Sequence, residues 1–188
     1  MKSVAITGSF ASGKSFVLKY LEKIGYNIFS CDDYVKQLYL DANIREDLLK
    51  FIDKMGKFFD KKRLIEIIYN DDSQRKKLEN YIHPKVREGI NDFKNKYADE
   101  QIIFVEVPLL FETEFNTYFD YSICVYCNEE NREKRAKKRG NFNLEIYNKI
   151  KNIQLSQEEK KKLADFQVNT DENIEFQISK VIDILNEY

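Results

Sequence analysis

The feature that most constrains this chain is an eight-residue stretch, residues 8–15 (GSFASGKS), that directly follows a short apolar run. It fits the pattern G-x-x-x-x-G-K-[S/T], in which small residues let the backbone curl so that successive N–H groups point inward at an anion. The helix predicted over residues 14–23 would add its unpaired amide donors and the positive end of its dipole. A strand, a glycine-containing loop and a helix in this order predict a phosphate-binding loop.

The parts of this loop have distinct expected contacts with a bound nucleotide. Backbone amides of residues 11–15 would surround the phosphates, Lys14 would neutralise oxygens of the β- and γ-phosphates, and the Ser15 hydroxyl would help to hold Mg²⁺. The alternative is a glycine turn with an incidental lysine, which the predicted strand and helix on either side disfavour. The residues expected to bind ATP are Gly8, Ala11, Ser12, Gly13, Lys14, Ser15 and Phe16.

Predicted strands and helices alternate along the rest of the chain. Apolar runs predict strands over residues 3–7, 26–30, 102–107, 120–126 and 166–168. Three-to-four spacing of apolar residues predicts helices over residues 14–23, 131–138, 144–153, 158–163, 173–187 and most of 33–97. The alternation predicts an α/β fold with a parallel sheet. The long helical block is expected to be an insertion, in which Pro84 begins or kinks a helix.

Composition limits the classes of function. The 188 residues carry 31 Lys and Arg against 32 Asp and Glu, a net charge of -1, whereas a general nucleic-acid binder would usually be strongly basic. No apolar stretch approaches the roughly 18 residues needed to cross a membrane, and the first residues hold no signal-peptide core. We therefore expect a cytoplasmic protein with neither nucleic acid nor a membrane as its partner.

The three cysteines are an odd, sparse set that does not form a disulfide framework. Cys124 and Cys127 form a C-x-x-C pattern, but they lie in the β-favouring run DYSICVYC, where residues three apart face opposite sides of a sheet. We expect buried, reduced thiols there rather than a metal or redox site.

A carboxylate pair follows the second predicted strand, in the sequence SCDDY. Ligands of open α/β sheets bind at the carboxyl ends of the strands, so Asp32 or Asp33 could accept or orient the proton of an acceptor hydroxyl. Either could instead cap the following helix, and position alone leaves both roles open. A guanine-specific switch protein is disfavoured, because NKYADE places Asp99 one position too late for the base-reading motif N/T-K-x-D.

Three arginines follow the fourth predicted strand. Arg132, Arg135 and Arg139 are spaced so that they share one face of a helix. Such a face is usually just solvated. Next to a phosphate-binding loop it favours a lid that clamps phosphate, since a guanidinium grips phosphate oxygens in two places.

Over almost its whole length the chain resembles the dephospho-CoA kinase family. The resemblance rests on the order and spacing of ITGSFASGKS, SCDDYVKQL, LENYIHPKV, VPLLFE, the pair Arg135 and Arg139, and Gln154 with Ala164 and Asp165. It implies one domain over 1–188: a P-loop kinase core (about 1–32, 99–128 and 157–188), an inserted helical CoA subdomain (about 33–98) and a helical lid (about 129–156). The activity that it implies is Mg-ATP-dependent phosphorylation of the 3′-hydroxyl of dephospho-CoA, giving coenzyme A and ADP.

The resemblance also implies roles for single residues. Asp32, rather than Asp33, matches the carboxylate expected to act as the base. Glu106 stands where many relatives have an acidic residue and is expected to assist Mg²⁺ with Ser15, directly or through water. The residues expected to act in catalysis are Asp32, Lys14, Arg135 and Arg139. The residues expected to contact the acceptor are Asp32, Lys36, His83, Pro108 and Leu109.

Three positions depart from the family pattern. Ser30 replaces the first carboxylate of the family's D-A-D segment, and Lys36 replaces an arginine, which keeps the charge but loses the two-pronged grip. Phe16 stands where a small hydroxyl residue is common, so a polar phosphate contact is not expected from its side chain. None of these changes touches the loop glycines or Asp32, and we expect the activity to be retained.

His83 has two interpretations. It is the single histidine of the chain, and it precedes Pro84 in a helical region far in sequence from the loop. It is either a satisfied histidine at a helix junction or a contact to the acceptor. Two rival functions also stay open: a P-loop kinase that acts on another small acceptor, and a nucleotide-binding regulatory protein without transfer activity. We expect a monomer or a weak homo-oligomer.

Overall fold

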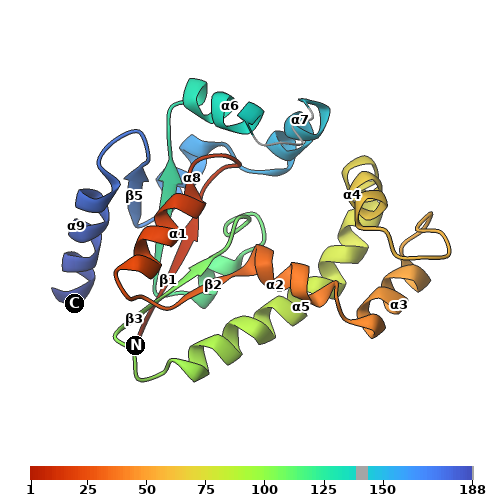
Figure 1. Ribbon diagram of the computed structural model, residues 1–188, viewed down its shortest axis with the longest axis horizontal. Coiled ribbons are helices and arrows are strands. Elements are labelled where there is room, and N and C mark those ends of the chain that lie inside the picture. The colour runs from red at the N-terminus through yellow and green to blue at the C-terminus, as the bar shows by residue number, and fades with distance from the viewer. Residues whose placement is uncertain (139–143, 188) are drawn as a thin grey trace. The chain divides into compact units, whose positions relative to one another are not determined.

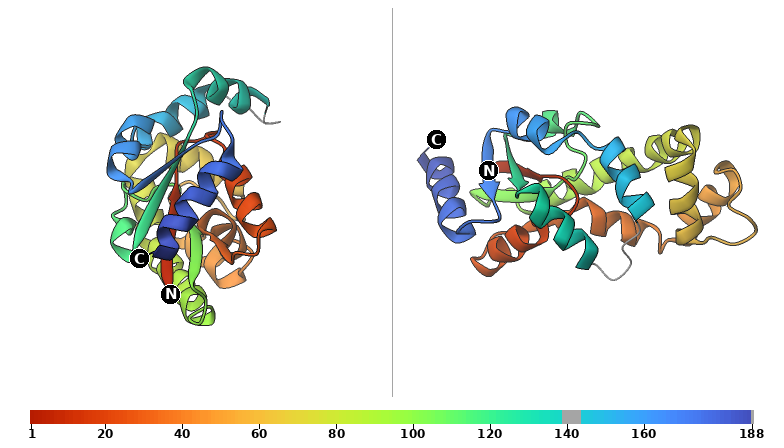
Figure 2. Two further views of the ribbon diagram at one scale, coloured as in Figure 1. Left: turned by 90° about the vertical axis from the view of Figure 1, so that its left-hand side faces the viewer. Right: turned by 90° about the horizontal axis from the view of Figure 1, so that it is seen from above.

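The computed structural model describes residues 1–138 and 144–187 of the chain, drawn as ribbons in Figure 1 and Figure 2. By its internal contacts the chain divides into two compact units. The first unit joins Met1–Ser30 to Tyr97–Tyr188, and the second is Cys31–Lys96. The second unit therefore interrupts the first between two of its strands.

The first unit is built on a sheet of five parallel strands in the order β2-β3-β1-β4-β5 (Figure 1). The strands are β1 (Lys2–Thr7), β2 (Ile28–Ser30), β3 (Ile102–Glu106), β4 (Tyr121–Tyr126) and β5 (Phe166–Asn169). β1 lies at the centre, where Ala5 pairs with Val105 on one side and Ser122 on the other. The predicted α/β fold with a parallel sheet is confirmed, although β2 is two residues shorter at its start than expected.

Two helices bury apolar faces on one side of this sheet. The helices described in the first unit are α1 (Lys14–Lys23), α6 (Glu129–Lys138), α7 (Leu144–Ile153), α8 (Gln157–Leu163), α9 (Ile174–Glu187) and the 3-10 turn η1 (Phe115–Tyr118). α1 and α9 pack on the core residues of the strands, with Val17 and Leu21 from α1 and Ile178 from α9 among the most buried. Each such side chain stabilises the fold by about 1.5 to 3 kcal/mol.

Two serine–aspartate pairs join neighbouring strands of the sheet. Asp120, just before β4, accepts from the amide and the hydroxyl of Ser3 on β1 at 2.7 and 2.8 Å. Asp165, just before β5, accepts in the same way from Ser122 on β4 at 2.8 and 2.7 Å. Each carboxylate therefore helps to hold two neighbouring strands in register. Asp165, which with Ala164 is part of the resemblance to the family, thus has a structural role.

The second unit is wholly helical in its regular structure. Its helices are α2 (Cys31–Leu38), α3 (Ala42–Phe51), α4 (Lys61–Asn70) and α5 (Asp72–Lys96). Side chains close the starts of two of them: Asp41 accepts from the amides of Asn43 and Ile44 at α3, and Asp60 accepts from the amide of Lys62 at α4. Such N-caps satisfy backbone donors that the helix itself leaves unpaired.

Helix α5 passes through Pro84 without ending. A proline inside a helix removes one hydrogen bond and costs about 3 kcal/mol or more. The cost is offset by a buried apolar face on both sides of the proline, formed by Leu78, Ile82, Val86 and Ile90. Of the two alternatives expected for Pro84, that it begins a helix is wrong, and that it kinks one stays a prediction.

All three cysteines are free and buried, as predicted for Cys124 and Cys127. Burial raises the pKa of Cys124 to about 11 and also raises the pKa of Cys127 above its ordinary value, so both thiols are protonated at neutral pH. Within the described ranges, no helix is both long and apolar enough to cross a membrane.

Candidate active site

The loop after β1 has a backbone that only glycine allows at two positions. Gly8 and Gly13 have φ angles of 149° and 103°, and Ala11 between them has a φ angle of 62°. A Cβ atom on Gly8 would lie 2.2 Å from the carbonyl oxygen of Val125, and one on Gly13 would lie 2.9 Å from the side chain of Thr170. The two glycines therefore let the loop curl while it lies directly against β4 and the segment after β5.

The start of α1 offers backbone donors instead of a side-chain cap. Gly13 holds the N-cap position, no described side chain accepts a hydrogen bond there, and the first turn contains no acidic residue. Lys14 folds back across the loop and donates to the carbonyl oxygens of Gly8 at 2.9 Å and Ser9 at 3.4 Å. The next two residues, Ser15 and Phe16, are exposed. This end of the helix is positive in potential and suits an anion.

Two loop hydroxyls support the same interpretation. The Oγ atoms of Ser9 and Ser12 are buried, and neither has a hydrogen-bond partner among the residues that the structure describes. Buried polar atoms without partners are rare and costly in folded proteins. Together with the curled backbone and Lys14, they fit a bound phosphate.

Glu106 ends β3 as a buried carboxylate. Its Oε2 atom accepts a hydrogen bond of 2.7 Å from the hydroxyl of Ser30, which lies opposite it in the register of β2 and β3. The serine in place of the family's first carboxylate thus spares Glu106 a like-charged neighbour. In the described part of the chain no three His, Cys, Asp or Glu side chains form a metal-binding group. A magnesium ion held by Glu106 and Ser15 would need phosphate oxygens and water as its further ligands, which is its usual arrangement in phosphotransferases.

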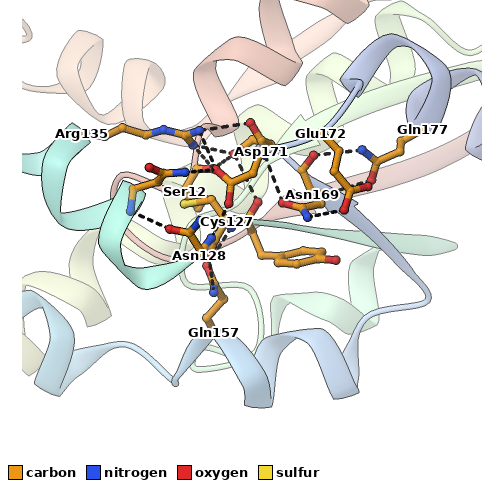
Figure 3. A network of polar contacts seen from close by, with 12 residues as sticks. Ser12, Cys127, Asn128, Arg135, Gln157, Asn169, Asp171, Glu172 and Gln177 are labelled. Atoms are coloured by element: carbon orange, nitrogen blue, oxygen red, sulfur yellow. Dashed lines mark hydrogen bonds and ion pairs between the residues drawn. The ribbon is translucent and has the colours of Figure 1, made fainter.

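Arg135 of α6 lies at the rim of the loop, in the network that Figure 3 shows. Its guanidinium donates to the Thr170 hydroxyl at 2.6 Å, to the carbonyl oxygen of Ser12 at 3.3 Å and to a carboxylate oxygen of Asp171 at 3.1 Å. The Thr170 hydroxyl in turn donates to the carbonyl oxygen of Ser12 at 2.6 Å. The segment after β5 therefore connects the arginine of α6 to the loop.

Asp171 also fixes the start of α6. Its carboxylate accepts from the amide of Asn128 at 2.6 Å and from the side chain of Asn131 at 2.8 Å (Figure 3). Neither Thr170 nor Asp171 is among the residues predicted from the sequence. Their place after the last strand was only a weak indication that they belong to the site, because the contact between this segment and the loop exists only in the folded chain.

The other two arginines of the predicted clamp differ from Arg135. Arg132 is buried and donates two hydrogen bonds, at 2.8 and 2.6 Å, to the carboxylate of Glu129, so its charge is neutralised within α6. Lys151 of α7 also pairs with Glu129, at 2.9 Å. Arg139 lies outside the described residues. Of the two arginines that the structure describes on this face, Arg135 is the one that contacts the loop.

The second unit carries three of the predicted acceptor residues, Asp32, Lys36 and His83. Asp32 and Asp33 lie in the first turn of α2, and both are exposed. Asp33 forms an ion pair of 2.5 Å with Lys36, whereas Asp32 makes no hydrogen bond or ion pair with a residue that the structure describes. Asp32 is thus the carboxylate of the two whose oxygens no described donor holds.

His83 lies inside α5 and not at a helix junction. It is half-buried, and burial, followed by the charge of Arg87, lowers its pKa below the ordinary value of 6.5. The imidazole is therefore neutral at pH 7.

Pro108 and Leu109 belong to a turn that follows β3 in the first unit. The carbonyl oxygen of Pro108 accepts from the Thr7 hydroxyl at 3.3 Å and from the Lys160 ammonium at 2.6 Å. Lys160 is fully buried, which sequence reasoning missed because it stands in the polar run QEEKKK. A run of charged residues ordinarily indicates a helix that is exposed to solvent.

A pocket of about 970 Å³ opens in the first unit beside the loop. Its walls come from Ser9, from the start of α6 and from the segment between α7 and α8, and Asp171 completes them. Many of the lining side chains are charged or amide groups, so the pocket suits a polar ligand.

The chain is similar to known proteins in both sequence and structure. The family model for dephospho-CoA kinase matches residues 2–175. A dephospho-CoA kinase of Rickettsia typhi is 42% identical over 185 residues, covering 97% of this chain and 96% of the relative. Among solved structures, a Thermus thermophilus protein has a TM-score of 0.85 at 26% identity, covering 99% of this chain and 97% of that one. A dephospho-CoA kinase from Campylobacter jejuni has a TM-score of 0.65 at 28% identity, covering 98% and 96%.

Proposed function

The chain belongs to the dephospho-CoA kinase family, and we propose that it transfers the γ-phosphoryl group of ATP to the ribose 3′-hydroxyl of dephospho-CoA. The observation that carries this proposal is the loop over residues 8–15, with its positive-φ glycines, its buried serine hydroxyls and the uncapped start of α1. Membership of this family does not favour a kinase for another acceptor or a regulatory protein without transfer activity.

The loop and α6 would act on the donor. The amides of residues 11–15 bind the phosphates, and Lys14 turns from the loop carbonyls to the β- and γ-phosphate oxygens. Arg135 at the rim, with Arg139, adds positive charge where negative charge develops during transfer. When bound, Mg²⁺ neutralises charge on the β- and γ-phosphates, and Ser15 and Glu106 are the residues that would hold it.

Asp32 would act on the acceptor. It takes the proton of the 3′-hydroxyl as the ribose oxygen forms its bond to the γ-phosphorus and the bond from that phosphorus to the β,γ-bridging oxygen breaks. The products are coenzyme A and ADP. Lys36, His83, Pro108 and Leu109 are the residues proposed to bind dephospho-CoA.

The parts of the chain would divide this work. Residues 33–98 form the proposed CoA subdomain, residues 129–156 the lid, and the rest the core that binds ATP. We propose a cytoplasmic enzyme that acts as a monomer or a weak homo-oligomer and binds no nucleic acid.

The test is a coupled measurement of ATP consumption and coenzyme A formation, with the product identified by mass. We expect Lys14→Ala to lower kcat/KM by about 10³-fold or more, because it removes a charge from the transferring phosphoryl group. We expect Asp32→Asn to lower kcat by about 10²- to 10⁴-fold with little change in the KM for ATP.

Asp33→Asn is the matched control, since it removes the neighbouring carboxylate of the same helical turn. It should keep kcat close to that of the wild type. Equal losses in Asp32→Asn and Asp33→Asn would contradict the assignment of the base. ATP hydrolysis that does not depend on dephospho-CoA, with no coenzyme A formed, would contradict the proposed reaction.

A further inference from the structure

A lysine with a fully buried side chain lies in the first unit. Lys160 of α8 has 0% of its side chain exposed, and its ammonium contacts the carbonyl oxygen of Pro108 at 2.6 Å and a carboxylate oxygen of Glu112 at 2.9 Å. Burying an ammonium group costs several kcal/mol unless partners of good geometry offset the cost. A lysine kept in such a place holds both of its partners firmly.

The fold selects this lysine from a run of three. A capping box between Ser156 and Glu159 fixes the start of α8 and so the direction in which each residue of the helix points. Lys161 pairs with Glu158 at 3.2 Å near the surface, and Lys162 is exposed. Of the three, Lys160 is the one that is fully buried.

Both partners of Lys160 belong to the segment 107–112 (VPLLFE). Pro108 follows β3, and its carbonyl oxygen also accepts from the hydroxyl of Thr7, the last residue of β1 before the phosphate loop. Glu112 lies at the other end of the segment. The ammonium group of Lys160 therefore contacts both ends of this segment.

Glu112 extends the connection to the end of α7. The carboxylate oxygen that binds Lys160 also accepts from the amide of Leu155 at 2.8 Å. The preceding residue, Gln154, accepts from the amide of Phe10 in the phosphate loop at 3.0 Å. Two consecutive residues after α7 thus contact the phosphate loop and the 107–112 segment, one each.

We propose that Lys160 is a positioning residue for the acceptor: it sets the place of the 107–112 segment and, through Glu112 and Leu155, couples that segment to the end of the lid. The inference rests on the proposed function, which places Pro108 and Leu109 against dephospho-CoA. Lys160 is buried and acts through the backbone of Pro108, so it makes no contact of its own with either substrate. Its loss should weaken binding of the acceptor and leave the binding of ATP nearly unchanged.

The experiment compares four variants by thermal melting and steady-state kinetics with each substrate varied in turn. Lys160→Met leaves the Glu112 carboxylate buried without its cation, which destabilises the fold strongly. The double variant Lys160→Met with Glu112→Gln removes both charges, and the amide oxygen of the new glutamine can still accept from Leu155. Leu109→Ala tests the acceptor segment itself. Lys162→Met is the matched control, an exposed lysine of the same helix.

We expect the double variant to melt close to the wild type and to show a KM for dephospho-CoA raised about tenfold, with the KM for ATP changed less than about twofold. Lys162→Met should change neither. A folded double variant with an unchanged KM for dephospho-CoA would overturn the inference. A double variant that fails to fold would assign the pair to stability and would also overturn it.

Leu109→Ala tests separately whether the 107–112 segment binds dephospho-CoA, which the inference about Lys160 assumes. If Leu109→Ala raises the KM for dephospho-CoA and the double variant does not, the role of Lys160 is wrong and the acceptor segment stands. If Leu109→Ala leaves that KM unchanged, the acceptor role of the segment is wrong, and the inference about Lys160 falls with it.

Discussion

The backbone amides at the start of a helix have no partner within the helix, and α1 differs from α3 and α4 in how they are paired. Asp41 and Asp60 cap α3 and α4 with carboxylates, at 2.7 and 2.8 Å from the nearest backbone nitrogen. At α1 the cap position is Gly13 in a left-handed conformation, and none of the described side chains replaces the cap. At α3 and α4 carboxylates of the protein pair with amides of the first turn, whereas at α1 no described side chain does so, which leaves that helix start to an external anion.

The difference teaches where stability and function lie in this chain. A cap contributes to folding, typically by about 1 kcal/mol, and holds a helix whether or not a ligand is present. An uncapped start gives up that contribution and gains a positive site. Changes at α1 should therefore act on ATP binding, and changes at α3 and α4 on folding.

The largest expected effect comes from giving α1 a cap like that of α3. We expect Gly13→Asp to bind ATP at least about tenfold more weakly than Gly13→Asn, because a carboxylate about 4 Å from a phosphate repels it by about 1 to 4 kcal/mol. Both variants share the strain of a side chain at a φ angle of 103°, so their difference isolates the charge. Calorimetric titration with ATP measures it.

Thermal melting of the same pair sharpens the result. The aspartate should stabilise the helix at least as well as the asparagine, since a negative charge favours a helix N-terminus. Equal ATP affinities of the two variants would mean that the phosphates do not bind at this helix start.

A smaller effect is expected at the arginine that reaches the loop. Thr170→Val keeps the methyl group beside Gly13 but removes the hydroxyl that joins Arg135 to the carbonyl oxygen of Ser12. A hydrogen bond of this kind contributes about 0.5 to 1.5 kcal/mol, so the KM for ATP should rise about two- to tenfold. Thr117→Val, which removes a surface hydroxyl bonded to Glu114, is the control and should leave that KM unchanged.

Removing a cap from the second unit should affect folding alone. We expect Asp41→Ala to lower the free energy of unfolding by about 1 kcal/mol and Asp60→Ala by less, because Asp41 accepts from two amides and Asp60 from one. Urea unfolding measures both. A large change in the KM for ATP in either variant, with the fold intact, would break the comparison between the two kinds of helix start.

The smallest expected effect is a pH dependence of stability from His83. Burial and Arg87 lower its pKa in the folded protein below 6.5, so the unfolded chain binds more protons here, and the folded state loses stability as the pH falls through and below that value. We expect the melting temperature to fall between pH 7.5 and pH 5.5, and to fall less in His83→Gln. An identical pH dependence in the two proteins would remove His83 as a contributor.

The sequence predicts the parts of this structure that depend on neighbouring residues. The phosphate loop, the strands and most helices follow from local spacing, and the order of the elements is enough for a parallel α/β sheet. Pro84 is an instructive exception, because the local rule makes it a candidate for a helix start and the structure has it inside α5. The local cost of the proline is outweighed by apolar contacts on both sides of it, and those contacts depend on the whole helical unit.

Within the site, the residues that sequence reasoning missed act across long stretches of chain. Thr170 contacts Ser12 across 158 positions of the sequence, and Lys160 contacts Pro108 across 52. No spacing rule predicts such pairs. Arg132 is a different case, because Glu129 stands three residues before it, and this local spacing already favours an ion pair within the helix.

The insertion of Cys31–Lys96 between β2 and β3 has a consequence for how a chain of this kind can change. Those two strands are parallel neighbours, so the chain between them must return from the carboxyl end of β2 to the amino end of β3. In a minimal α/β protein a single helix makes that return, and here an entire helical unit does. If this unit binds the acceptor, as proposed, its exchange for another crossover would change the acceptor preference. Its deletion without a replacement would leave β2 and β3 with no connection long enough for parallel pairing.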